Sequence, residues 1–302
     1  MSSSKLVKII FFGNEQLAQG LEKPATPIFD ALVASGCEIA ALVLPRRAEP
    51  RSRRAKKLAV IDAAERLSVP IIYADEERDL DKTLRQFGAE IGVLASFGMI
   101  VKKSTIDLFP RGIVNIHPSL LPKYRGSSPI ETAIAEGARE TGVSLMALGE
   151  RMDAGAVYTQ EKIALTGDES KQELYEKLAA CGAQMLVKNL DEIIAGQLTP
   201  TPQDESAATY SRLLTKADGT LDQTTMTASE CERKIRAFAG FPRTRLVFMG
   251  REVIVTKAHV ETISQHPYGV LCVDCKWLVV DELVAPTSGK TMPIADYLRG
   301  LR

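Results

Sequence analysis

Long apolar runs and a disulfide framework are the first features that this sequence lacks. None of its apolar runs approaches the roughly 18 residues that a membrane-spanning helix needs, and residues 1–4 do not form the basic region that opens a secretory signal peptide. The chain of 302 residues has five cysteines, an odd number, so reduced thiols are the simpler interpretation. We therefore expect a soluble cytoplasmic protein with no membrane partner.

A net charge of either sign is also missing, because 38 basic and 38 acidic residues balance. The balance hides one strongly basic segment between residues 46 and 57, in which a single acidic residue opposes the cations. These cations are Arg46, Arg47, Arg51, Arg53, Arg54, Lys56 and Lys57. Such a run is either a solvated charged loop or a set of contacts for a polyanion, and composition alone leaves both open.

Apolar runs alternate with helical patterns through the first part of the chain. Runs rich in Val, Ile and Phe predict buried strands at residues 5–12, 39–44, 70–73 and 91–96. Helices are predicted between them, and Thr26 is placed to cap the first helix with Pro27 at its first position. Alternation at this spacing predicts right-handed crossovers and an α/β fold with a doubly wound parallel sheet.

Two polar residues end the next predicted strand, at residues 112–116. Asn115 and His117 are expected at the carboxyl edge of the sheet, where folds of this class bind ligands. A further strand at residues 143–148 precedes a loop with Asp153, and residues 170–195 have helical periodicity that ends at Gly196. We place the first domain at residues 1–196.

Prolines and small polar residues then predict an exposed linker at residues 197–206. Beyond it, a helix near residues 228–239 precedes short β-rich runs, which predict a smaller antiparallel sheet or β-barrel in a second domain at residues 207–302. Cys272 and Cys275 form a Cys-x-x-Cys with no second pair and no histidine at zinc-finger spacing downstream. We expect a β-turn with buried thiols there, and no metal site.

Two motifs resemble those of a known family. Residues 115–130 read NIHPSLLPKYRGSSPI and resemble the signature of the 10-formyltetrahydrofolate-dependent formyltransferases, and ETGVSL at residues 140–145 followed by MDAG at residues 152–155 resembles their second motif. The resemblance implies a Rossmann-like formyltransferase domain, 10-formyltetrahydrofolate as co-substrate, and catalysis by Asn115, His117 and Asp153. It also implies that a loop along the folate carrier is formed by Ser119, Leu120, Leu121 and Pro122.

The chemistry of formyl transfer suits these residue types. An amine that attacks a formyl carbon creates a tetrahedral oxyanion, which needs hydrogen-bond donors placed in advance. Asn115 offers an amide donor and protonated His117 a charge-assisted one, while Asp153 orients the imidazole and can accept the amine proton through water. A lone His or an Asp in a turn is by itself more often structural, but within these two motifs we favour catalysis.

The second domain bears on which amine is formylated. Residues 209–222, 236–238, 241–242 and 250–258 resemble the C-terminal domain of the methionyl-tRNA formyltransferases, an oligonucleotide-binding-like barrel that contacts tRNA. In that family a basic loop after the second strand enters the acceptor arm of initiator tRNA, and residues 46–57 occupy the same place. The resemblance therefore implies initiator methionyl-tRNA as the acceptor and the basic segment as a tRNA contact, in a protein that we expect to be a monomer.

Two other functions stay open at this point. Nucleotide-sugar N-formyltransferases share the catalytic motifs and can carry a similar second domain, and a tRNA-binding protein that had lost catalysis would keep the basic segment. The chain also departs from the family in its first turn, where Asn14 and Glu15 replace the usual Thr-Pro and residues 16–25 lengthen the loop. The geometry of this loop can therefore differ from that of relatives.

Overall fold

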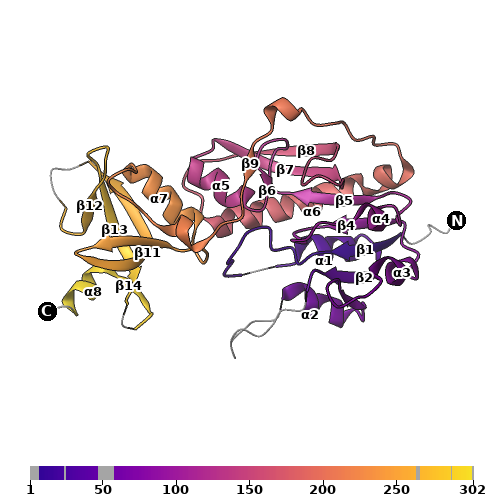
Figure 1. Ribbon diagram of the computed structural model, residues 1–302, viewed down its shortest axis with the longest axis horizontal. Helices are drawn as coiled ribbons and strands as arrows, with labels where there is room; N and C mark the ends of the chain where they lie inside the picture. Colours follow the sequence, from indigo (N-terminus) through magenta and orange to yellow (C-terminus); the bar gives the residue numbers. More distant parts are fainter. Residues whose placement is uncertain (1–6, 24, 47–57, 263–265, 287, 301–302) are drawn as a thin grey trace.

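A seven-stranded sheet in the order β3-β2-β1-β4-β5-β7-β8 forms the centre of the first domain (Figure 1). The computed structural model describes residues 7–23, 25–46, 58–262, 266–286 and 288–300. The strands of this sheet are β1 (Lys8–Phe12), β2 (Glu38–Leu44), β3 (Ile71–Tyr73), β4 (Ile91–Leu94), β5 (Ile113–His117), β7 (Glu140–Ala147) and β8 (Val157–Ala164). The predicted parallel arrangement is confirmed from β3 to β5, whereas β7 and β8 add an antiparallel pair at one edge.

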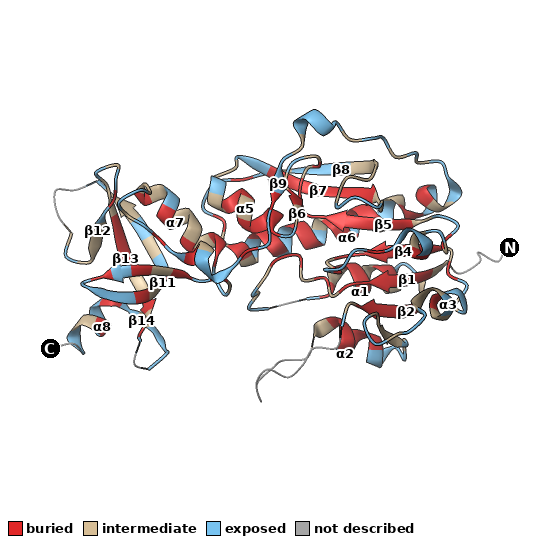
Figure 2. Cartoon of the chain, viewed as in Figure 1, coloured by how far each residue is buried: buried red, intermediate tan, exposed pale blue. Residues whose placement is uncertain are grey.

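Helices cover both faces of this sheet because successive strand residues point to opposite faces. In β1, Ile9 and Phe11 belong to one apolar core, and Ile10 and Phe12 belong to the other. The first core lies under α1 (Pro27–Ala34), α2 (Ala59–Arg66), α5 (Pro129–Glu136) and α6 (Lys171–Ala195), and the second lies under α3 (Leu80–Arg85) and α4 (Lys103–Ile106). Figure 2 shows the strands as a largely buried layer between these helices.

The long helix α6 begins and ends at the predicted signals. The Ser170 side chain accepts a bond from the backbone of Glu173, whose carboxylate accepts in return from the Ser170 backbone, and Gly196 ends the helix in a left-handed conformation. Although α6 has 25 residues, no helix in the described part of the chain combines the length and the apolar character needed to cross a membrane.

Helix α1 is capped by a different residue from the one predicted. Thr26 makes no side-chain bond to a helix N–H, and its hydroxyl donates to Asp30 instead. The carboxyl group of Glu15 takes the cap position, since its two oxygens accept from the backbone N–H groups of Ile28 at 2.8 Å and Phe29 at 2.7 Å. Glu15 is 0% exposed, and this burial raises its pKa to about 8. The departure at Glu15 is therefore a helix cap supplied from the lengthened loop.

The chain does not leave the first domain at the end of α6. Residues 197–214, which we name the crossing segment, return over the first domain (Figure 1). Thr201 and Val157 exchange two backbone hydrogen bonds of 2.8 Å, and farther on β9 (Tyr210–Ser211) pairs in parallel with β6 (Arg125–Gly126). Leu214 is buried in the first domain's core, whereas Leu221 belongs to the core of the second. The predicted exposed linker is thus the beginning of a longer attached segment.

The second domain contains the predicted antiparallel sheet. Its strands β10 (Thr244–Phe248), β11 (Arg251–Glu261), β13 (Trp277–Val284) and β12 (Gly269–Leu271) are neighbours in that order, and β14 (Thr291–Pro293) pairs with β13. The helices α7 (Ala228–Ala237) and α8 (Ile294–Arg299) cover this sheet, and α7 also packs against α5 of the first domain. The two domains therefore meet through helices and through the crossing segment.

The predicted turn at the two cysteines is confirmed, but only one thiol is buried. The backbone N–H of Cys275 donates to the carbonyl of Cys272 at 3.0 Å, which closes a β-turn. Cys272 is buried in the second core, whereas Cys275 is exposed at the turn. The expectation of two buried thiols is wrong because the turn points the second cysteine to solvent.

Candidate active site

Strand β5 places two of the predicted catalytic side chains side by side. Asn115 and His117 are two residues apart, so they lie on the same face of the strand, while Ile116 between them packs into the first core. Both polar residues are 5% exposed. They lie at the carboxyl end of the parallel strands, as the sequence predicts.

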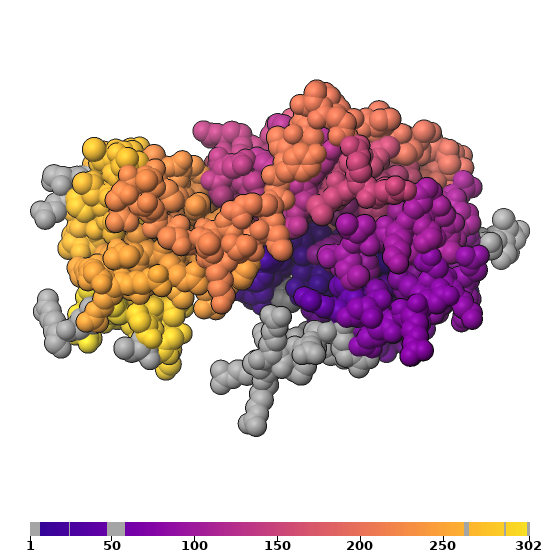
Figure 3. All heavy atoms as spheres, in the orientation of Figure 1, coloured from indigo at the N-terminus to yellow at the C-terminus, as the bar shows by residue number. Residues whose placement is uncertain are grey.

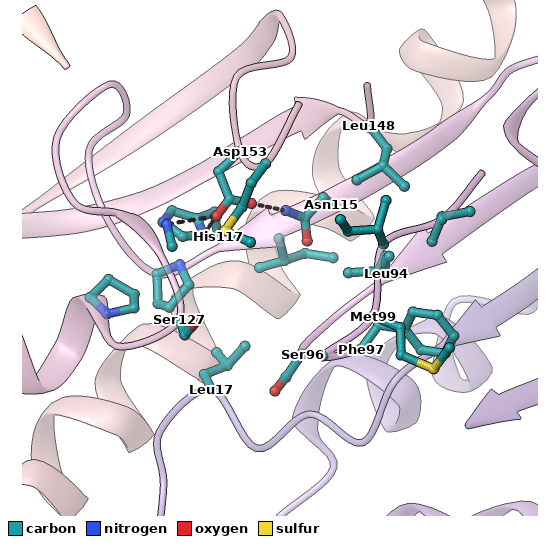
Figure 4. A pocket seen from close by; sticks show the side chains of 18 of the residues that line it. Leu17, Leu94, Ser96, Phe97, Met99, Asn115, His117, Ser127, Leu148 and Asp153 are labelled. Carbon is teal, nitrogen blue, oxygen red and sulfur yellow. Dashed lines mark hydrogen bonds and ion pairs between the residues drawn. The ribbon is translucent and has the colours of Figure 1, made fainter. Parts of the chain in front are cut away.

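Asp153 reaches the same place from the loop between β7 and β8. Its Oδ1 accepts from Nδ2 of Asn115 at 3.4 Å, and its Oδ2 lies 3.7 Å from Nδ1 of His117 (Figure 4). A stronger bond of 2.8 Å, donated by the backbone N–H of Gly126 to Oδ2, fixes the carboxylate. The structure thus brings together the three residues that the motifs single out, from two distant parts of the chain.

The hydrogen bonds of His117 define which of its nitrogens faces the reaction. Nε2 lies 3.0 Å from the backbone carbonyl of Tyr124, and a carbonyl only accepts, so Nε2 carries a proton. In the neutral ring Nδ1 is therefore the unprotonated nitrogen, and it points toward Asp153. A second proton on Nδ1 would convert this nitrogen into a charged donor beside a carboxylate.

A cavity of about 400 Å³ opens over these three residues. This volume is within the range of roughly 300–1,000 Å³ that is typical of small-molecule sites. Its walls come from separate parts of the chain, namely residues 16–19, 94, 96–101, 115–118, 126, 127, 129, 148–153 and 213. In Figure 3 a recess separates the purple first-domain surface from the orange crossing segment. The cavity therefore has one wall from the crossing segment, through Leu213.

Much of the cavity wall was not predicted from the sequence. Residues 96–101 follow β4, which neighbours β5 in the sheet, and they include the exposed apolar side chains of Met99 and Ile100. The rule that ligands bind beyond the carboxyl ends of parallel strands could have indicated this loop. Met152 and Leu213 add two more exposed apolar side chains to the wall. These contacts suit a flat or apolar ligand next to the polar catalytic group.

Two buried side chains of opposite charge, Glu131 and Lys171, hold the lengthened loop at the cavity. The carboxylate of Glu131 accepts from the backbone N–H of Gln19 at 2.8 Å, while Nζ of Lys171 donates to the carbonyl of Gln19 at 2.5 Å and to that of Phe241 at 3.2 Å. Burial raises the pKa of Glu131 and lowers that of Lys171 to about 8, against the opposing attraction of the two charges. Because Phe241 belongs to the second domain, Lys171 ties the cavity loop to that domain.

The loop predicted to follow the folate carrier is packed against β7 and β8. Its bonds run through Ser144, whose hydroxyl donates to the carbonyl of Ser119 at 2.6 Å and accepts from the N–H of Leu121 at 3.0 Å. Gln160 of β8 donates to the Leu121 carbonyl at 2.8 Å. Pro118 lines the cavity, but the cavity lining does not include Ser119, Leu120, Leu121 or Pro122.

Only one cation of the basic segment is described. Arg46 is exposed and lies two residues beyond the end of β2. The other predicted contacts, Arg47, Arg51, Arg53, Arg54, Lys56 and Lys57, lie outside the described residues. Within those residues, no group of three or more His, Cys, Asp or Glu side chains is arranged to hold a metal ion.

Comparison with known proteins identifies the family. The profile of the formyl transferase family matches residues 11–190, and that of the formyl transferase C-terminal domain matches residues 213–302. The chain belongs to the formyl transferase family. It is 32% identical over 309 residues to the methionyl-tRNA formyltransferase of Roseiflexus castenholzii, covering 98% of this chain and 96% of that relative. It is 30% identical over 321 residues to that of Heliobacterium modesticaldum, covering 98% of each.

Solved structures of formyl transferases have the same fold. This formyl transferase superposes on the N-formyltransferase from Helicobacter canadensis, determined in complex with folinic acid and dTDP-3-aminofucose, with a TM-score of 0.65. The match covers 91% of this chain and 98% of that chain at 16% sequence identity. At this identity the likeness concerns the fold, so it agrees with an α/β domain followed by a smaller β domain and leaves the acceptor open.

Proposed function

We propose that this formyl transferase moves the formyl group of 10-formyltetrahydrofolate onto the methionine amino group of initiator methionyl-tRNA, in the cytoplasm, for translation initiation. The observation that carries the chemistry is the convergence of Asn115, His117 and Asp153 at one cavity. The acceptor is supported by the similarity of nearly the whole chain to methionyl-tRNA formyltransferases. The protein acts as a monomer in this proposal.

The reaction follows from the positions of the three side chains. The amine nitrogen attacks the formyl carbon, and the oxyanion that forms is stabilised by the amide of Asn115 and by Nδ1–H of protonated His117. Asp153 keeps the imidazolium oriented and accepts the amine proton through water. The bond from carbon to N10 of the carrier then breaks, and N10 leaves with the proton that the amine gave up, which Asp153 returns through the water. No covalent enzyme intermediate is needed.

The cavity provides the place for the folate carrier. We propose that the ring system lies against residues 96–101 and 148–152, where apolar side chains and backbone surround a space next to Asn115. The formyl group would then lie at the polar end of the cavity. Contact of Ser119, Leu120, Leu121 and Pro122 with the carrier stays a prediction, because these residues are absent from the cavity lining.

The acceptor arm of the tRNA would approach from the side of the basic segment and the second domain. Lysine and arginine side chains that neutralise phosphates release counterions, so binding of this kind weakens steeply as salt increases. Arg46, two residues beyond the end of β2, marks where the basic segment begins. The seven cations of this segment are therefore proposed as tRNA contacts.

One assay tests both the chemistry and the acceptor. The protein is incubated with formyl-labelled 10-formyltetrahydrofolate and either methionylated initiator tRNA or an amino-sugar nucleotide, and label in each acceptor is counted. We expect label in methionyl-tRNA only. Label in the amino-sugar nucleotide alone would overturn the proposed acceptor. Binding of tRNA with no turnover of any acceptor would indicate an escort protein and overturn the proposed chemistry.

A further inference from the structure

One side chain of the crossing segment holds the catalytic loop from outside. The half-buried side chain of Gln203 donates its amide hydrogens to two carbonyls of that loop, those of Asp153 at 2.9 Å and Gly155 at 2.7 Å. Its own oxygen accepts from Nε of Arg125 at 3.0 Å and from a terminal nitrogen of the same guanidinium at 2.8 Å. If the amide of Gln203 were flipped, its NH2 group would face the N–H groups of Arg125 and its oxygen would face the two carbonyls, so these four bonds define the orientation of the amide.

Arg125 is a rigid anchor for this arrangement. It is only 1% exposed and belongs to β6, next to Gly126, the residue whose N–H holds the Asp153 carboxylate. Both terminal nitrogens of the guanidinium also donate to Glu205, at 3.0 and 3.1 Å. A buried guanidinium with these bidentate bonds has little freedom to move. Gln203 therefore connects the Asp153 loop to a fixed point of the first domain.

The Asp153 loop needs such a support. Asp153 has φ of 49°, a left-handed conformation that residues with a side chain seldom adopt and that persists only where neighbours impose it. Its carboxylate is held by Gly126 on one side, and its own carbonyl is held by Gln203 on the other. Without Gln203 the peptide after Asp153 would lose its restraint, and the carboxylate could move away from His117.

We propose that Gln203 is a positioning residue for the reaction, which acts by holding Asp153 beside His117 and touches no substrate. The proposal rests on the proposed function to the extent that Asp153 takes part in formyl transfer. It places a determinant of the catalytic geometry in the segment that joins the two domains. From the sequence, Pro202, Gln203 and Asp204 predict an exposed linker, and only the hydrogen bonds of the folded protein reveal the role of Gln203.

A double-mutant cycle tests this role. Gln203→Met keeps the length of the side chain and removes all four bonds, and we expect kcat to fall about 10- to 100-fold, because a displacement of about 1 Å at a catalytic group can cost on the order of 100-fold. KM for folate should change by less than about threefold. In an Asp153→Ala background the same change should have almost no further effect. Gln197→Met, at an exposed position of the same segment, is the matched control.

Two outcomes of this cycle would overturn the proposal. One is an unchanged kcat for Gln203→Met, and the other is an equal loss of kcat in the wild-type and Asp153→Ala backgrounds, which would mean general damage. If Gln203→Met fails to fold, Gln203→Glu replaces it, since a carboxylate still accepts from Arg125 but cannot donate to Asp153 and Gly155. Gln203→Glu should then lower kcat by the same range of about 10- to 100-fold, and an unchanged kcat would overturn the proposal.

A measurement without substrate separates this proposal from the proposed function. The chain has three histidines, so the imidazole nitrogen resonances of His117 can be assigned by comparison with a His117 variant. They should move in Gln203→Met and stay in place in Gln197→Met, whatever the acceptor is. Unmoved resonances would overturn the positioning role even if methionyl-tRNA is formylated. If the wild type formylates a different amine, the cycle is run with that acceptor.

Discussion

The buried carboxyl group of Glu15, which caps α1, predicts that the wild type and a Glu15→Gln variant exchange their order of stability as the pH rises. Glu15 is 0% exposed, and burial raises its pKa to about 8 from 4.5. The unfolded chain loses this proton near pH 4.5, while the folded chain keeps it up to about pH 8. Between these values the folded state binds more protons, so this group lowers the free energy of unfolding as the pH rises. The side-chain amide of a Glu15→Gln variant would not titrate in this range.

The size of the effect follows from the width of this pH window. About 1.36 kcal/mol for each pH unit over roughly 3.5 units gives a loss of about 5 kcal/mol in the wild type between pH 4.5 and 8. The Glu15→Gln variant does not have this loss of stability with pH. Its amide nitrogen is a donor that faces a helix N–H, so one capping hydrogen bond is missing, which lowers the free energy of unfolding by about 1–2 kcal/mol at every pH. The variant should therefore be less stable at pH 5, equal near pH 6, and more stable at pH 8.

Urea unfolding followed by circular dichroism from pH 5 to 8 measures the difference directly. The neighbouring titratable groups Asp30 and Tyr175 are common to both proteins, so they largely cancel in the comparison. A difference between the two midpoints that stays constant across this range would refute the reasoning, because it would mean that Glu15 is charged in the folded protein throughout. A variant that is more stable at pH 5 would refute the capping role.

Three further predictions concern the catalytic group, the basic segment and the domain contact. Asn115→Ala and Asp153→Ala should each lower kcat by on the order of several hundredfold in initial-rate assays, and a loss below about tenfold would remove that residue from the catalytic group. Replacing Arg51, Arg53 and Arg54 of the basic segment with uncharged residues should raise KM for tRNA and reduce the salt dependence of this KM. An unchanged salt dependence would argue against tRNA contact by this segment. Gly240→Ala would place a methyl carbon 1.9 Å from the Gly20 carbonyl and should lower the melting temperature by several degrees more than Gly250→Ala, which has a similar φ and open space around it. Equal melting temperatures of the two variants would show that the close approach of Gly240 to Gly20 does not stabilise the fold.

The sequence predicts the parallel part of the sheet because its strands are buried on both faces. The four residues of β1 after Lys8 and all of β4 lack polar side chains, and an uninterrupted run of this kind stops at a clear boundary. The edge strand β8 was missed for the opposite reason. Its residues are mostly half-buried or exposed, and the middle of VYTQEKIA is polar, so neither a continuous run nor a clean alternation marks it.

The catalytic group was predictable only in part from local pattern. Asn115 and His117 are two residues apart at a strand end, and this spacing alone places both on one face at the sheet edge. Their closeness to Asp153 comes from tertiary structure, and the family motif rather than the pattern led to it. The cap of α1 illustrates the same limit, because Thr26 satisfies the local rule while the carboxyl group of Glu15 already occupies the position.

The crossing segment changes where the catalytic unit of this formyl transferase ends. A boundary at residue 196 follows the end of α6, but it would separate Asp153 from Gln203 and leave the buried Arg125 without Gln203 and Glu205. A buried charge that loses its partners is strongly destabilising. Since Leu214 also closes the first core, the unit that can hold the catalytic geometry reaches at least to this residue. The same stretch of chain that leads to the second domain therefore supports the catalytic aspartate.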